Sequence, residues 1–299
     1  MLEIKKLAAI DIGSNAIRLL ISNVIISEDR APQFKKSSLV RVPIRLGADV
    51  FVNDGVISDA NIDRMIHAMK AFKLLMNVHN VEKYKACATS AMREASNGHE
   101  VTAKISSKTG IKIDIIGGKE EAEIISSTNL NELIEGDNTY LYVDVGGGST
   151  EFTLFSKGKT ISSKSFEMGT VRLLNNKKSV NKEIFYNVEK WVKKHTKDLK
   201  NVSLIGSGGN INKLFKMSGR TEGKPISFIY LNAQYQFLKN MSYEDRISEL
   251  SLNPDRADVI IPATKIYLSA MKWSGARKIY VPKIGLSDGI IKTLYYSQF

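Results

Sequence analysis

The sequence contains the same short pattern twice, and this repeat constrains the fold more than any other feature. Residues 7–21 read LAAIDIGSNAIRLLI and residues 140–155 read YLYVDVGGGSTEFTLF. Each segment has an apolar, β-rich run that ends in an aspartate, a glycine-rich turn with serine, and a second apolar run. The pattern predicts two β-hairpins, and two copies of one unit indicate a duplication.

The segments that follow each hairpin support the duplication. YKACATSAMREAS and IKIDIIGGKEEAEII follow the first, and VSLIGSGGNINKLF and KIYVPKIGLSDGIIKTL follow the second, all reading as strand, loop and helix. Helices are also predicted behind a Ser58 cap, over residues 182–199, and over residues 254–275, where Gly275 ends the helix. The chain is therefore expected to be α/β with mixed sheets.

The length of 299 residues favours two domains. We expect the boundary near residues 124–128, with domains at residues 1–125 and 126–299. Hydrophobic residues make up 43% and charged residues 25% of the chain, a composition typical of globular proteins.

Two further features bear on location and chemistry. The chain has no apolar run of about 18 residues and no secretory apolar region near its start, so we expect a cytoplasmic protein without a membrane partner. Cys87 is the only cysteine, which excludes an intramolecular disulfide and a multi-thiolate metal site. Its apolar strand predicts a buried, inert thiol.

The formal net charge is +12, from 43 Lys and Arg against 31 Asp and Glu. A positive surface concentrates polyanions, so nucleic acid, anionic lipid and polyphosphate are all candidate ligands on charge alone. The lysines are scattered, with pairs at Lys177–Lys178 and Lys193–Lys194, and no arginine-rich arm or zinc-finger spacing occurs. Such lysines usually form a solvated face, and we expect no specific nucleic-acid binding.

The first hairpin turn predicts a phosphate-binding loop. Asp11 precedes Gly13, Ser14 and Asn15, which offer backbone N–H groups on a tight turn with hydroxyl and amide side chains. A glycine turn without function is the better interpretation of one such motif, but its repetition favours binding.

The second hairpin turn predicts a stronger phosphate site. Glycines leave backbone N–H groups open to a phosphoryl oxygen, and a nearby carboxylate suits a divalent cation. Asp144 precedes this turn, Glu151 follows it, and with Asp11 they are the candidate metal ligands. The turn itself consists of Gly146, Gly147, Gly148 and Ser149.

Two strand-to-helix junctions add candidate phosphate ligands. Thr89 and Ser90 place hydroxyls at a helix N-terminus, and Arg93 follows one turn later, where it could clamp a phosphate. A helix cap and a surface ion pair explain these residues equally well. Gly208 and Gly209 form a comparable junction in the second half.

Hydrolysis also needs a base, and Glu121 in the segment GKEEA is the candidate. A carboxylate at the start of this helix could orient and deprotonate a water molecule. Acids in a first helical turn are also favoured by the helix dipole, and spacing alone favours this interpretation over a catalytic role.

Together these motifs resemble the exopolyphosphatase and guanosine pentaphosphate phosphohydrolase family, within the sugar kinase, heat-shock protein 70 and actin superfamily. The resemblance spans nearly the whole chain and rests on AAIDIGSNAIRLLI, ATSAMREASNG, IIGGKEEAEII, YVDVGGGSTEF, FEMGTVRL and IGSGGNINKL. It implies two actin-like ATPase (ribonuclease H-like) domains with mixed sheets, with the two phosphate loops facing each other across an interdomain cleft.

The resemblance also implies roles for single residues. Glu121 corresponds to the catalytic glutamate, Arg93 to a phosphate ligand, and Asp144 and Glu151 to acids that hold magnesium or the attacking water. Mg²⁺ or Mn²⁺ is the implied metal, a monovalent cation is a further candidate, and a homodimer is expected.

Longer members of this family carry a helical HD-type domain. This sequence contains no adjacent His-Asp pair, and we expect it to lack that domain, which favours short polyphosphate chains. Ser287 also replaces a more usual arginine, which removes a positive contact.

The expected function is magnesium-dependent release of terminal phosphate from inorganic polyphosphate. Guanosine pentaphosphate is the alternative substrate, because scattered positive charge does not separate two polyanions. A non-catalytic sensor of guanosine tetraphosphate or polyphosphate, and a sugar or acetate kinase, are the remaining alternatives.

Overall fold

The computed structural model describes residues 2–52, 55–128 and 138–298 and divides the chain into two compact units. Unit 1 comprises residues 1–128 together with residues 286–299, and unit 2 comprises residues 129–285. The expected boundary at residues 125 and 126 lies close to the first division. The C-terminal segment differs from the prediction, because it packs in unit 1.

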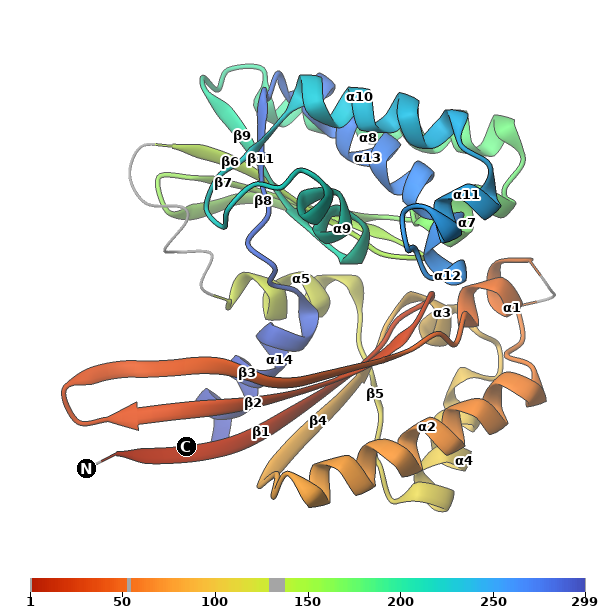
Figure 1. The fold of residues 1–299 in the computed structure, drawn as a ribbon, viewed down its shortest axis with the longest axis vertical. Helices are drawn as coiled ribbons and strands as arrows, with labels where there is room; N and C mark the ends of the chain where they lie inside the picture. The colour runs from red at the N-terminus through yellow and green to blue at the C-terminus, as the bar shows by residue number, and fades with distance from the viewer. Residues whose placement is uncertain (1, 53–54, 129–137, 299) are drawn as a thin grey trace. The chain divides into compact units, whose positions relative to one another are not determined.

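Unit 1 is built on a five-stranded mixed sheet in the order β3-β2-β1-β4-β5 (Figure 1). The strands are β1 (Glu3–Ile12), β2 (Ile17–Ser27), β3 (Arg30–Val42), β4 (Lys83–Ala88) and β5 (Asp114–Ile115). The helices are α1 (Leu46–Val52), α2 (Asp59–Val78), α3 (Ser90–Glu94), α4 (Gly98–Thr109), α5 (Gly118–Ser126) and α14 (Leu286–Gln298).

Helices cover both faces of this sheet. Ala8, Ile10 and Ile12 belong to the core that includes the apolar face of α2. Leu7 and Ala9 are also fully buried, and the alternation of a strand turns them to the opposite face. Figure 1 shows α2 and α4 on one face and α14 on the other, where α14 contacts β1, β4 and β2. Burial on both faces explains the continuous apolar run of β1.

Unit 2 contains a six-stranded sheet in the order β10-β11-β9-β6-β7-β8. Its strands are β6 (Thr139–Val145), β7 (Thr150–Ser156), β8 (Lys159–Phe166), β9 (Val202–Ser207), β10 (Ile226–Ser227) and β11 (Lys278–Tyr280). Its helices are α7 (Thr170–Asn175), α8 (Lys178–Thr196), α9 (Gly209–Met217), α10 (Phe228–Asn240), α11 (Tyr243–Ser248), α12 (Pro254–Ala257) and α13 (Ile260–Ser274).

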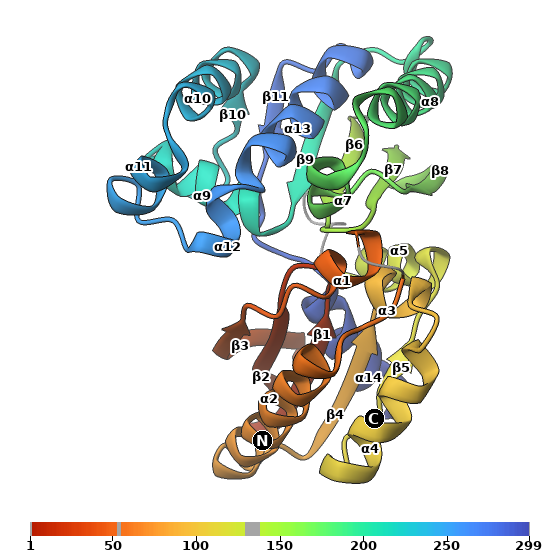
Figure 2. The same cartoon turned by 90° about the vertical axis from the view of Figure 1, so that its right-hand side faces the viewer.

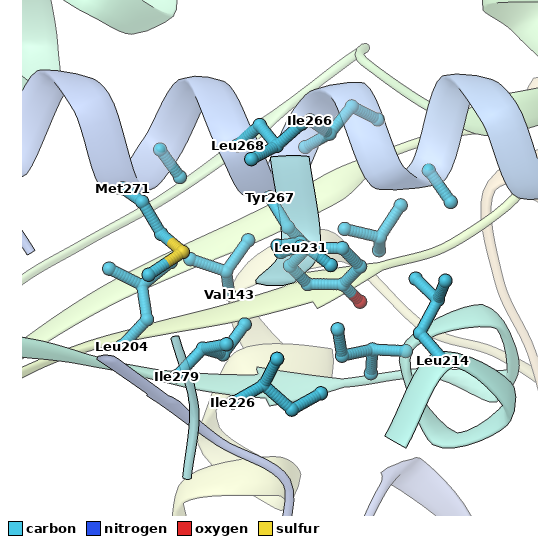
Figure 3. Packing of buried hydrophobic residues seen from close by; sticks show 14 of the residues in the cluster. Val143, Leu204, Leu214, Ile226, Leu231, Ile266, Tyr267, Leu268, Met271 and Ile279 are labelled. Carbon is cyan, nitrogen blue, oxygen red and sulfur yellow. The ribbon is translucent and has the colours of Figure 1, made fainter. Parts of the chain in front are cut away.

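The core of unit 2 lies between the sheet and α13. Figure 3 shows Tyr267 and Met271 of α13 among strand residues such as Val143, Leu204 and Ile279. Helices α8 and α10 pack against α13 and extend the same layer (Figure 2).

The two sheets confirm the predicted duplication. In unit 1, β1 pairs antiparallel with β2 and parallel with β4, and β4 pairs parallel with β5. In unit 2, β6 pairs in the same way with β7 and β9, and β9 pairs parallel with β11. The antiparallel edge strands β3 and β8 also correspond, and β10 is an addition at the other edge of the second sheet.

The predicted helices form, with one difference. Ser58 caps α2, its Oγ accepting from the N–H of Asn61 at 3.4 Å. The single helix expected over residues 254–275 is divided into α12 and α13, and Gly275 ends α13 in the left-handed conformation as predicted.

Candidate active site

The register of the unit 1 sheet brings three loops together. Ile12 at the end of β1 lies beside Ala88 at the end of β4, which lies beside Ile115 at the end of β5. Because these strands are parallel, the loops that follow them leave the same edge of the sheet. The N–H of Thr89 donates to the Ile12 carbonyl at 3.1 Å, and the N–H of Ile116 donates to the Ala88 carbonyl at 3.0 Å.

The first loop is held as a tight turn. The N–H of Gly13 donates to the Ala16 carbonyl at 3.1 Å, which closes the turn around Ser14 and Asn15. The Ser14 carbonyl accepts from the N–H of Gly47 at 2.8 Å, so the start of α1 fixes the turn from outside. The two predicted phosphate ligands therefore sit on a backbone with little freedom.

Asp11 has a partner that the sequence interpretation missed. Its side chain is buried, and its Oδ2 lies 2.9 Å from Nη1 of Arg18. Asp11 and Arg18 face each other in the β1–β2 register. Residues equally distant from a hairpin turn pair across it, so the spacing could have revealed this ion pair. The metal role of Asp11 stays a prediction.

The junction after β4 holds the predicted hydroxyls and Arg93. Thr89 and Ser90 are buried at the start of α3, and Thr89 Oγ1 is 3.4 Å from the Ile12 carbonyl. Arg93 Nη1 donates to the Ile116 carbonyl at 2.6 Å. Arg93 thus ties α3 to the loop before α5 with one of its five N–H donors.

The two adjacent acids of α5 differ in their surroundings. Gly117 precedes the helix, and the N–H of Glu121 donates to the Gly117 carbonyl at 2.9 Å. Glu121 is buried whereas Glu120 is exposed. A helix dipole favours both acids equally, so burial distinguishes Glu121 as the candidate for chemistry.

In unit 2 the hairpin places two carboxylates opposite each other. Asp144 on β6 faces Glu151 on β7 in the antiparallel register, so both side chains project from one face. Glu151 is buried, and its Oε1 accepts from Ser149 Oγ at 2.7 Å and from Ser165 Oγ at 2.9 Å. These bonds hold Glu151 against the glycine turn.

The glycine turn is oriented by α7. The carbonyls of Gly146 and Gly147 accept from the N–H groups of Thr170 and Val171 at 3.0 and 2.9 Å, and the Gly148 carbonyl accepts from Arg172 Nε at 2.9 Å. The N–H and C=O of a trans peptide point in opposite directions. The N–H groups that follow these three carbonyls therefore turn away from α7, as in an anion-binding nest.

Gly169 is a structural requirement of this turn. A Cβ at this position would lie 2.2 Å from the Gly147 carbonyl oxygen and 2.2 Å from the Gly148 carbonyl carbon. Only glycine admits such a close approach. The motif FEMGTVRL pointed to this segment, but the sequence interpretation gave Gly169 no role.

The glycine-rich junction after β9 lies beside the glycine turn at residues 146–149. Ser207 at the end of β9 pairs with Asp144, and Gly208 follows with a φ of +117°. A Cβ on Gly208 would be 2.9 Å from the Val145 carbonyl oxygen and 3.6 Å from Asp144 Oδ1. Gly209 then begins α9. The need for glycine at position 208 thus has a steric cause, and the phosphate-binding role of Gly208 and Gly209 stays a prediction.

Two buried tyrosines brace this end of the sheet. The Tyr142 hydroxyl donates to Asp144 Oδ2 at 3.4 Å, and the Tyr267 hydroxyl donates to the Ser207 carbonyl. Burial raises the pKa of both phenols well above the usual value, and the carboxylate of Asp144 raises the pKa further. Both hydroxyls therefore stay protonated as donors.

The acidic pair suits a hard divalent cation. Mg²⁺ is commonly held by one or two carboxylates, with waters and substrate phosphates as the other ligands, and Asp144 and Glu151 provide such a pair. Across residues 2–52, 55–128 and 138–298, no three side chains of His, Cys, Asp or Glu gather as a metal-binding group. Asp144 and Glu151 fit the donor set that this mode of binding requires.

Comparison of the sequence with models of protein families shows which family the chain belongs to. The family model described as the Ppx/GppA phosphatase family matches residues 25–297. The chain belongs to the Ppx/GppA phosphatase family. It is 31% identical over 303 residues to the bifunctional 3-dehydroquinate synthase/phosphatase of Fusobacterium nucleatum, covering 92% of this chain and 44% of that protein. It is 32% identical over 177 residues to exopolyphosphatase 2 of Mycobacterium tuberculosis, covering 58% and 54%. The chain thus spans about half the length of these curated relatives.

Solved structures of the family share the fold. An exopolyphosphatase from Cytophaga hutchinsonii superposes with a TM-score of 0.85 at 23% identity over 98% of both chains. A Ppx/GppA family member from Aquifex aeolicus gives a TM-score of 0.79 at 23% identity over 99% of both chains. These structures confirm the predicted α/β fold of two mixed sheets. Within the described ranges, no helix is both long and apolar enough to cross a bilayer.

Proposed function

We propose that this family member releases terminal phosphate from inorganic polyphosphate in a reaction that requires magnesium. The observation that carries the proposal is the glycine turn at residues 146–149. Its carbonyls are bound by the start of α7, and its N–H groups turn away from that helix beside two carboxylates. This arrangement suits a phosphoryl group that is bound together with a cation.

The proposal gives each of these residues a role. Glu121, buried in the first turn of α5, orients and deprotonates the attacking water. The N–H groups of the glycine turn and the guanidinium of Arg93 stabilise charge on the transferred phosphoryl group. Asp144 and Glu151 would hold Mg²⁺, which supplies charge neutralisation when bound.

Phosphate release by the purified protein tests the proposal. Long-chain polyphosphate and guanosine pentaphosphate are compared as substrates, each with Mg²⁺ and with EDTA. Glu121→Gln should lower kcat on the preferred substrate by about 10²–10⁴-fold, the usual contribution of a general base. Glu120→Gln is the matched control, because Glu120 is adjacent but exposed, and it should keep most of the activity.

Three results would contradict the proposal. If Glu120→Gln and Glu121→Gln lost activity equally, Glu121 would not be the general base. If phosphate were released faster from guanosine pentaphosphate than from polyphosphate, guanosine pentaphosphate would be the preferred substrate. Tight binding of either polyanion without any phosphate release would favour a sensor.

A further inference from the structure

The helix α8 and its flanks carry much of the positive charge of the chain. Residues 177–200 contain eight lysines and three acidic residues, a net charge of +5, whereas the whole chain carries +12. All eight lysines are exposed. Lys193 pairs with Glu189 at 2.6 Å and Lys197 lies 3.8 Å from Asp198. Within the described residues, none of the other six lies within 4 Å of an acid.

The lysines gather on one side of α8. At about 100° per residue, six of them fall within an arc of about 160°. The opposite side carries Val188 and Val192, which are fully buried in the core. Glu183 and Glu189 are the acids on the exposed arc. We call this surface the lysine face, and it consists of Lys178, Lys182, Lys190, Lys193, Lys194 and Lys197.

Two further lysines flank the lysine face. Lys164 of β8 lies over the ring of Phe166, which packs edge-on against Trp191 of α8. Lys265 of α13 lies over the ring of Phe185, which is also on α8. Both ammonium groups are on exposed residues, so the positive surface continues to either side of the helix.

The lysine face begins near the glycine turn within the same unit. Val171 of α7 donates its N–H to Gly147 of the turn, and Asn181 in the first turn of α8 donates to the Leu173 carbonyl of α7 at 2.9 Å. The two helices are adjacent in Figure 2. A helix of 19 residues is about 28 Å long, so the lysines follow a track that leads away from the turn.

We propose that the lysine face of α8 binds the polyphosphate chain whose terminal phosphate is hydrolysed, an inference that rests on the proposed function. Closely spaced lysines repel one another, and a polyanion relieves this repulsion and releases counterions. A lysine ammonium is a point charge without directional preference, which suits a polymer of identical phosphates. The arginines that read base edges are absent from residues 177–200.

Neutralising part of the face tests the proposal. The test variant carries Lys182→Gln, Lys190→Gln, Lys194→Gln and Lys197→Gln. The control variant carries Lys35→Gln, Lys70→Gln, Lys108→Gln and Lys112→Gln, all exposed positions of unit 1. Both variants lose four charges, so an effect of net charge alone would be equal in the two. Circular dichroism and thermal unfolding check that both are folded.

Binding of long-chain polyphosphate is measured over a range of salt concentrations. In the test variant we expect Kd to rise at least about tenfold and the slope of log Kd against log salt to fall by about three. The KM for phosphate release from long chains should rise in parallel. The KM and kcat for tripolyphosphate should stay within about twofold of wild type, because a short chain does not reach far along α8.

Other outcomes would overturn the proposal. These are equal weakening in the control variant, an equal rise in KM for tripolyphosphate, or a preference of the lysine face for single-stranded RNA over polyphosphate. If wild type releases no phosphate from any substrate, the proposed function fails. The Kd values of the two variants for polyphosphate would still show whether the lysine face binds polyphosphate.

Discussion

At the scale of single residues, the carboxylate of Asp144 has neighbours on two sides. The Tyr142 hydroxyl lies 3.4 Å from Oδ2, and the backbone of Gly208 approaches Oδ1. Tyr142 is buried, so its ring is held by packing and its hydroxyl has a fixed direction. We therefore regard Tyr142 as a positioning residue for Asp144.

Tyr142→Phe should lower kcat about tenfold, because Asp144 loses a donor that fixes its orientation. The KM and the midpoint of thermal unfolding should change little, since the aromatic ring remains. Tyr140→Phe removes a hydroxyl two residues earlier on the same strand and should leave kcat near wild type. Steady-state phosphate release gives kcat and KM for both variants, and thermal unfolding gives their midpoints. A wild-type kcat in Tyr142→Phe would exclude the positioning role.

The residues also show what the sequence could reveal. Cys87 is buried as predicted, and burial raises the pKa of its thiol to about 12, which keeps it unreactive. The glycine turn at residues 146–149 was recognised because consecutive glycines have few other uses. Gly169 was not, because its need for glycine arises from the backbone of Gly147 and Gly148, which lie far from it in the sequence. The Arg18 partner of Asp11 likewise depends on the register across the hairpin.

At the scale of elements, the short α5 is held by the C-terminal helix. Gly289 of α14 approaches α5 so closely that a Cβ there would lie 2.2 Å from the Ile124 carbonyl oxygen. Ile124 lies one turn after Glu121 on α5. The position of Glu121 therefore depends on how closely α14 packs.

Gly289→Ala should displace α5 from α14 and lower kcat for phosphate release by about tenfold or more. The free energy of unfolding should fall by about 1–3 kcal/mol, as is usual for overpacking. Ser297→Ala, on an exposed residue of the same helix, should change neither quantity appreciably. Urea unfolding and kinetics measure the two effects; a fully active Gly289→Ala protein would show that α14 does not set the position of Glu121.

The sequence predicted the helices and strands better than it predicted the unit to which each of them belongs. Apolar runs joined by glycine-rich turns predicted both hairpins, and apolar periodicity predicted α2, because buried segments leave a local signal in the sequence. The segment KIYVPKIGLSDGIIKTL was predicted as one strand-loop-helix unit of the second domain. Its strand β11 lies in unit 2, but α14 packs in unit 1. The apolar pattern of a helix predicts that one of its faces is buried, but it does not indicate which sheet that face packs against.

At the scale of the whole molecule, the two units differ in chain connectivity. Unit 2 is one continuous segment, whereas unit 1 is completed by the C-terminal helix. Four aliphatic residues of α14 are buried: Leu286, Ile290, Ile291 and Leu294. At about 1.5–3 kcal/mol for each buried side chain, α14 contributes roughly 6–12 kcal/mol of apolar burial. This amount is comparable with the total stability of a typical domain.

Deleting residues 286–299 should therefore unfold unit 1 and leave unit 2 folded. Hydrogen exchange measured by mass spectrometry should show loss of protection in β1, β4 and α5, with protection retained in β6 and β9, whose core is separate. Thermal unfolding of the truncated protein should show one transition of reduced enthalpy, because only one unit still unfolds cooperatively. Loss of protection in both sheets would instead mean that the units depend on each other for stability. Retained protection in β1 would mean that α14 is dispensable for unit 1.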